Sequence, residues 1–147
     1  MFNGIIYNQG IIKSIYRNPK YVSGSLVIEV SCNISFKKQD IGESVSCDGV
    51  CLTLITIKKN ILEFYLSNET ILRSKFSDIK KNDLINLELP LKYGQKISGH
   101  ICQGHVDTVG KVVSIKKIDK SYLFDFEIAK NQTKYLIEKA SICVNGI

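Results

Sequence analysis

The sequence lacks several features that would place it in a large class of proteins. None of its apolar runs approaches the ~18 residues that a membrane-spanning helix needs. Its first residues, MFNGIIYNQG, have neither the basic start nor the long apolar stretch of a secretory signal. The five cysteines form no Cys-x-x-Cys pair and lack the spacing of a disulfide framework or a four-thiolate zinc site. We therefore expect a cytoplasmic protein with reduced thiols, no metal and no membrane association.

Arginine is scarce, although the chain is basic. The formal net charge is +6, but Arg17 and Arg73 are the only arginines among 20 basic residues, and the lysines are scattered in ones and twos. Arginine makes the bidentate contacts to phosphate and guanine that are typical of nucleic-acid binding. Because no basic stripe or RNA-binding motif accompanies the charge, we predict no nucleic-acid partner. The length of 147 residues suits one globular domain or two small ones.

The sequence does contain an internal repeat. Three pairs of segments match in the same order: GIIYNQGIIKSI (4–15) with GHVDTVGKVVSI (104–115), SLVIEV (25–30) with YLFDFEI (122–128), and ESVSCDGV (43–50) with ASICVNGI (140–147). The offset is 100 residues at Gly4 and Gly104, and 97 at Glu43 and Ala140, so only loop lengths differ. Three matches in one order indicate a duplicated structural unit.

The first copy continues past Val50 for about forty residues that have no counterpart in the second. The predicted elements are a buried strand over 51–57, a turn over 58–60, a return strand over 61–66, a helix over 69–76 capped by Ser67 or Asn68, and a strand over 83–90. In the last strand, Ile85, Leu87 and Leu89 share one face, and Asn86 and Glu88 share the other. A sheet cut in half would expose strand edges and core. We therefore expect the chain to be a piece of a longer protein.

Short strands separated by Gly, Asn and Asp turns are typical of an antiparallel barrel or sandwich. Two tandem copies predict two similar barrels, with about six strands in each complete copy. We divide the chain into a first barrel over 1–90, a linker over 91–98 and the N-terminal part of a second barrel over 99–147.

Four segments together resemble the riboflavin synthase alpha chain family: MFNGII at the start, DGVCLTL at 48–54, SNET at 67–70 and GHICQGHVDTVG at 99–110. The resemblance covers the whole chain in order. It implies an all-β fold of tandem six-stranded antiparallel Greek-key barrels, the second one incomplete here, and a homotrimer at full length. The implied activity is that of a transferase in riboflavin biosynthesis. It converts two molecules of 6,7-dimethyl-8-ribityllumazine into riboflavin and 5-amino-6-ribitylamino-pyrimidinedione, without a cofactor.

The resemblance also implies which residues contact ligand. The lumazine-binding residues of the first barrel would be Ser44, Cys51, Leu52, Thr53, Tyr65, Leu66, Ser67, Asn68, Glu69, Thr70, Gly104, His105 and Val106. Gly4, Ile5 and Ile6 would border the ligand of the second barrel, and Lys139 matches a lysine contributed from that barrel. The candidates for assisting proton transfer are Ser44, Cys51, Thr53 and His105. Holding two rings face to face would supply much of the acceleration.

Other interpretations of these residues stay open. His100, Cys102 and His105 lie within six residues and invite a zinc site, but no further ligand cluster accompanies them. The repeat places His105 opposite Ile5 and so explains it by position. Cys51 also fits a buried strand cysteine that behaves as a small hydrophobe. A non-catalytic lumazine- or flavin-binding protein of the antenna type and an inactive fragment are the alternative functions. We expect little or no synthase activity from residues 1–147 alone.

Overall fold

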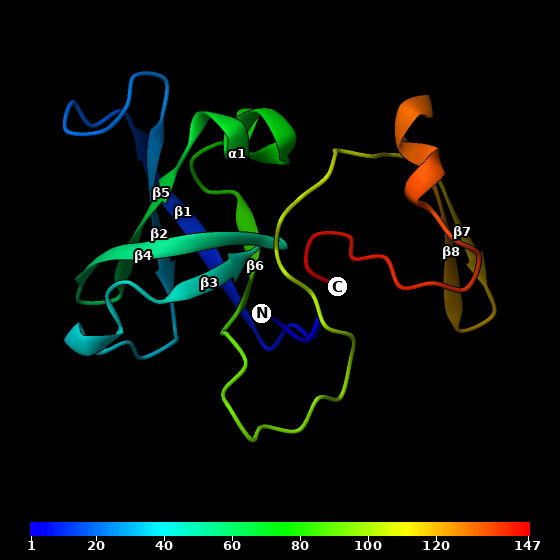
Figure 1. Cartoon of the computed structure of the whole chain (residues 1–147), viewed down its shortest axis with the longest axis horizontal. Coiled ribbons are helices and arrows are strands. Elements are labelled where there is room, and N and C mark those ends of the chain that lie inside the picture. Colours follow the sequence, from blue (N-terminus) through cyan, green and yellow to red (C-terminus); the bar gives the residue numbers. More distant parts are fainter.

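The computed structural model describes all 147 residues and shows a closed β-barrel followed by a separate hairpin unit (Figure 1). The barrel strands are β1 (Asn8–Tyr16), β2 (Leu26–Cys32), β3 (Ser44–Cys47), β4 (Val50–Lys58), β5 (Ile61–Leu66) and β6 (Leu84–Glu88). They pair antiparallel in the closed order β1-β2-β5-β4-β3-β6. Since β2 pairs with β5 and β1 with β6, the connections cross the barrel in Greek-key fashion. The predicted all-β fold with a six-stranded antiparallel barrel is confirmed.

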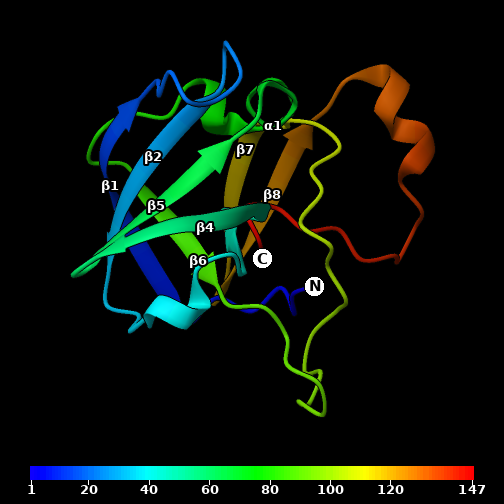
Figure 2. The ribbon, with the colours of Figure 1, turned by 60° about the vertical axis from the view of Figure 1, so that its left-hand side comes forward.

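The barrel has a continuous apolar interior because alternate residues of its strands point inward. Fifteen buried residues form this core, among them Ile28, Leu54, Phe64 and Leu87. Short helical segments cover the open ends of the barrel: η1 (Lys38–Asp40), α1 (Asn68–Arg73) and η2 (Lys75–Ser77) (Figure 2). None of the helices in the protein is long and apolar enough to span a membrane.

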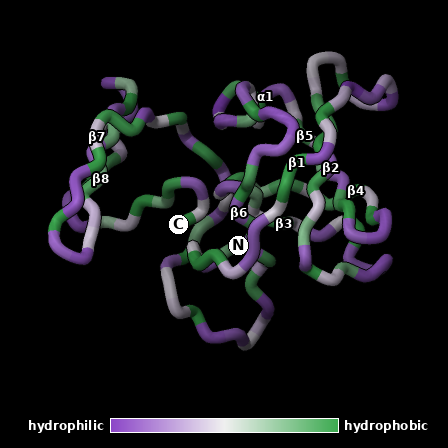
Figure 3. The backbone as a smooth tube through the Cα atoms, turned by 180° about the vertical axis from the view of Figure 1, so that it is seen from behind, coloured by the Kyte–Doolittle hydropathy of each residue, from purple (hydrophilic) through white to green (hydrophobic).

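The second unit has no core of its own. It consists of the hairpin β7 (Lys111–Ile118) and β8 (Ser121–Glu127), the 3-10 helix η3 (Lys130–Tyr135) and an irregular segment that runs to Ile147. Gly146 is the one buried residue after Pro90. Apolar side chains of the hairpin are therefore exposed. Figure 3 marks the hydrophobic positions along β7 and β8 in green.

The backbone of the hairpin repeats an irregularity of the barrel. The register of β1 against β2 shifts between Ile12 and Ser14, and that of β7 against β8 shifts between Val112 and Ser114. Positive φ angles recur at equivalent positions: 71° at Gly4 and 81° at Gly104, 48° at Asp48 and 50° at Asn145, 82° at Gly49 and 86° at Gly146. The repeat seen in the sequence is thus also a repeat of backbone conformation.

Two predicted details of the first copy are wrong. The helix expected over 69–76 ends at Arg73, because the Ser74 hydroxyl donates to the Thr70 carbonyl and accepts from the Phe76 amide, which begins η2. Ser67 is its N-cap, with Oγ accepting from the Thr70 amide at 3.1 Å.

The second difference concerns β6. Glu88, expected on the polar face, is only 7% exposed, and Leu89, expected on the apolar face, is 41% exposed. The strand ends at Glu88, so the alternation stops there and Leu89 leaves the barrel. The carboxylate of Glu88 is buried because it binds the N-terminal segment, as described below.

Candidate functional site

Three candidate residues lie in one row across the outside of the barrel. Ser44 of β3 pairs with Thr53 of β4, and Thr53 pairs with Tyr65 of β5. Their strand neighbours point into the core, so these three side chains point outward. Thr53 is exposed and the other two are half-buried. The Tyr65 ring packs at a tilt on Tyr21, with 4.8 Å between ring centroids. The row combines two hydroxyls with an aromatic surface, which suits a planar polar ligand.

Residues 67–70 extend this row at the end of β5, where the chain turns into α1. The Ser67 and Thr70 hydroxyls lie 3.0 Å apart, and the Asn68 amide donates to the Ser23 carbonyl at 2.9 Å. Glu69 is exposed and accepts from the Arg73 guanidinium at 2.6 Å. The first turn of α1 therefore places hydroxyl and amide groups beside Tyr65.

A segment of the second copy lies along the barrel next to β4. This crossing segment, residues 101–107, begins with a two-way backbone pairing between Phe2 and Cys102, with N–O distances of 2.8 and 3.0 Å. The Cys51 amide then donates to the Gly104 carbonyl at 2.8 Å. Val106 packs against the barrel core. Exposure alternates along the segment, so His105 faces away from the barrel between two residues that contact it.

Gly104 is the point of closest approach between the crossing segment and β4. A Cβ at this position would lie 2.8 Å from Cβ of Cys51 and 2.9 Å from its amide nitrogen. The backbone also has a φ of 81°, which side-chain-bearing residues rarely adopt. Glycine is thus required both by space and by conformation.

The N-terminal segment contacts both β6 of the barrel and the end of the second copy. The amides of Asn3 and Gly4 donate to the Glu88 carboxylate of β6 at 2.5 and 3.1 Å. A Cβ on Gly146 would lie 3.4 Å from the side chain of Ile6. Gly4 to Ile6 therefore lie beside residues 143–146 rather than in the outer row of the barrel. Sequence reasoning missed Glu88, because its position in a strand gives no sign of a partner 84 or 85 residues away.

Three other candidates are placed apart from the outer row. The side chains of Leu52 and Leu66 belong to the barrel core, at 2% and 0% exposure, so only their main chains face outward. The resemblance implies that Leu52 contacts the lumazine, and from this placement such a contact could involve its main chain but not its side chain. Lys139 is exposed on the segment that follows η3, with a φ of 62° that matches the positive φ of Gly42 in the first copy.

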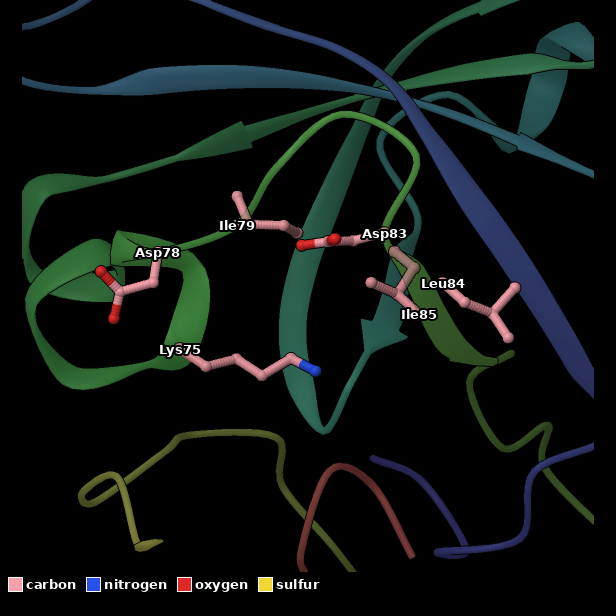
Figure 4. Close-up of a pocket in the computed structure, with 6 residues that line it drawn as sticks. All are labelled: Lys75, Asp78, Ile79, Asp83, Leu84 and Ile85. Carbon is pink, nitrogen blue, oxygen red and sulfur yellow. The ribbon is translucent and has the colours of Figure 1, made fainter.

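Two cavities of the protein lie away from the outer row. One, of about 290 Å³, is lined by Lys75, Asp78, Ile79, Asp83, Leu84 and Ile85 (Figure 4). The other, also of about 290 Å³, is lined by residues 109–111 and 127–129. In the first cavity the Lys75 ammonium points towards the β3–β4 turn and forms an ion pair with Asp48 at 2.7 Å, without the alignment of a hydrogen bond. The candidate site is the outward-facing row on β3, β4 and β5 beside the crossing segment.

Cys32 and Cys47, the other two cysteines of the first barrel, are buried and therefore unreactive. Burial raises the pKa of Cys47 well above its ordinary value, and burial also raises the pKa of Cys32. Both thiols are therefore protonated at neutral pH. No three His, Cys, Asp or Glu side chains are grouped so that they could hold a metal ion.

Comparison with known proteins gives the same architecture and a family. The model of the lumazine binding domain matches residues 3–90 and 103–147. Riboflavin synthases from Chlamydia trachomatis and Buchnera aphidicola are 33% and 32% identical over the whole chain, which covers 69% and 70% of their lengths. The riboflavin synthase of Bacillus subtilis is 28% identical, with 66% of its length covered. The chain thus spans about two thirds of the length of these curated relatives.

Solved structures of LumP share the fold. The complex with 6,7-dimethyl-8-(1'-D-ribityl)lumazine superposes with a TM-score of 0.79 and the complex with riboflavin with 0.80, each at 22% identity, over 100% of this chain and 77% and 78% of theirs. The fold and the repeat together define an all-β protein with one closed barrel and an incomplete second copy of the same unit. More narrowly, the chain belongs to the lumazine binding domain family.

Proposed function

We propose that this chain binds 6,7-dimethyl-8-ribityllumazine on the outer row of its first barrel. The observation that carries the proposal is the in-register row of Ser44, Thr53 and Tyr65, closed on one side by the crossing segment at Cys51. Backbone groups along β4 and the crossing segment match the ring's polar edge, and the two hydroxyls match the ribityl chain. The LumP complexes, which share the fold, support a ligand of this chemistry.

We further propose that the protein acts as a riboflavin synthase, a cytoplasmic transferase that works as a homotrimer at the relatives' full length. The identity of 32–33% to riboflavin synthases supports this assignment. Two lumazines would be held face to face, one losing a methyl proton and donating a four-carbon unit to the other. The thiol of Cys51 and the hydroxyls of Ser44 and Thr53 belong to the proposed binding face, and His105 belongs to the crossing segment that borders it. These four groups are the candidates for moving the proton.

Calorimetric titration of the purified chain with the lumazine tests the binding site. Thr53→Val should weaken binding about tenfold, since a lost hydrogen bond costs about 1.5 kcal/mol. Ser141→Ala is the matched control: Ser141 is the repeat counterpart of Ser44 and is exposed in the coreless unit, so binding should be unchanged. No saturable binding up to about 1 mM lumazine would refute the proposal.

Turnover separates the enzyme from a binding protein of the antenna type. The protein at the relatives' full length, mixed with the lumazine, should produce riboflavin, detected by its fluorescence. Tight binding without riboflavin would instead assign the non-catalytic function.

A further inference from the structure

Two thiols from distant parts of the second copy meet at the boundary between the two units. The sulfur atoms of Cys102 and Cys143 lie 2.7 Å apart. A disulfide holds its sulfurs at about 2.05 Å, so joining them needs a movement shorter than one bond length. Cys32 and Cys47 are buried in the first barrel, and Cys51 is half-buried on β4.

Independent backbone contacts hold each of these thiols in place. Cys102 is paired on both sides of its peptide with Phe2. Cys143 precedes Asn145, whose carbonyl accepts from the Asn86 side chain at 3.1 Å. The next residue, Gly146, packs closely on the turn between β3 and β4. Both segments are therefore anchored to the first barrel, and their anchoring brings the sulfurs together.

The pair is also accessible from one side. Cys143 is exposed, whereas Cys102 is half-buried. Both sulfurs lie against Gly4, at 3.4 and 3.8 Å from where its Cβ would be, so no side chain separates them from the N-terminal segment. Small disulfide reagents can therefore reach Cys143 first, with Cys102 directly behind it.

We propose that Cys102 and Cys143 are a redox pair that forms an intrachain disulfide by exchange with a low-molecular-weight disulfide of the glutathione type. The Cys143 thiolate attacks one sulfur of the small disulfide. A mixed disulfide forms between Cys143 and that half of the reagent, and the other half leaves as one small thiol. Burial and the contact with Cys143 raise the pKa of Cys102 to about 12, so the Cys102 thiol gives up its proton to solvent as its sulfur attacks the Cys143 sulfur and releases the second small thiol. Two protein thiols lose two electrons, one small disulfide gains them, and the two protons end on the released thiols.

The bond would clamp the second unit onto the barrel. It would close a loop over residues 102–143, which contains β7, β8 and η3. The crossing segment and the segment after η3 would then no longer separate independently. The proposal does not depend on lumazine binding, because neither thiol lies in the outer row.

Mass spectrometry tests the proposal. The folded chain is equilibrated with glutathione disulfide, quenched with acid, alkylated and digested with trypsin. The expected product is chain lighter by two hydrogens, with peptide 97–111 joined to peptide 140–147. Limited proteolysis within the closed loop should slow by at least about tenfold. Cys51→Ser is the matched control and should keep the cross-link, whereas Cys143→Ser should abolish it.

Other products would overturn the proposal. A stable glutathione adduct on Cys143 with Cys102 still free would show that the second thiol cannot resolve it. A cross-link through Cys51, or a fully reduced chain after the same treatment, would equally contradict it.

Discussion

Replacing Glu88 by Gln should detach the N-terminal segment from the barrel. Glu88 is 7% exposed and takes part in none of the three ion pairs of the protein, so the amides of Asn3 and Gly4 provide its stabilising contacts. A hydrogen bond to a charged group is worth about 1.5–3 kcal/mol. Glutamine keeps one acceptor oxygen but turns an NH₂ donor towards the other amide. We expect a loss of about 2 kcal/mol, local to residues 1–7.

Hydrogen exchange at the two amides measures this loss directly. A change of 2 kcal/mol corresponds to roughly a 30-fold fall in protection of Asn3 and Gly4, while the barrel strands keep theirs. Glu63→Gln is the matched control. Glu63 is 6% exposed on β5 and binds Lys58 at 2.5 Å, away from the N-terminal segment. If the protection of the Asn3 and Gly4 amides in Glu88→Gln stays within twofold of that in the unmodified chain, the role assigned to Glu88 is refuted.

Three further outcomes follow from the structure. Gly104→Ala places a Cβ 2.8 Å from β4 and should lower the free energy of unfolding, measured by urea titration, by more than about 2 kcal/mol. The control Gly94→Ala has a similar φ but open space around it, and should lower the free energy of unfolding by about 1 kcal/mol. At pH 8, iodoacetamide should label Cys143 but not Cys47, whose raised pKa keeps it protonated; equal rates by mass spectrometry would contradict this. Phe124→Lys should reduce concentration-dependent self-association in light scattering, because this ring is exposed on the hairpin.

The positions of the barrel's strands and turns were predicted well, because each of them is determined by residues that are close together in the sequence. The strands over 51–57 and 61–66 correspond to β4 and β5, and Ser67, one of the two expected caps, starts α1. The Asp48-Gly49 and Asn145-Gly146 turns have the positive φ angles that such pairs favour.

Contacts between segments far apart in the sequence could not be predicted in the same way. The burial of Glu88 depends on amides at the other end of the first copy, and the approach of Cys102 to Cys143 depends on how their two segments pack on the first barrel and its N-terminal segment. Strand alternation carries no information about such partners, because it records only which face of one sheet is buried. Leu52, named by resemblance as a ligand contact, has its side chain in the core, in keeping with the alternation of buried Leu52 and Leu54 with the outward Thr53.

The crossing segment has a consequence for how the protein is synthesised. The Cys51 amide finds its acceptor at Gly104, and Val106 completes the packing on the barrel. The barrel strands are complete at Glu88, and at a translation rate of about 5–20 residues per second the ribosome needs roughly 1–3 s to add the 16 residues from there to Gly104. Throughout that interval the Cys51 amide at the start of β4 lacks its acceptor. The start of β4 is therefore most exposed to wrong pairing with a neighbouring nascent chain before residues 101–107 have emerged.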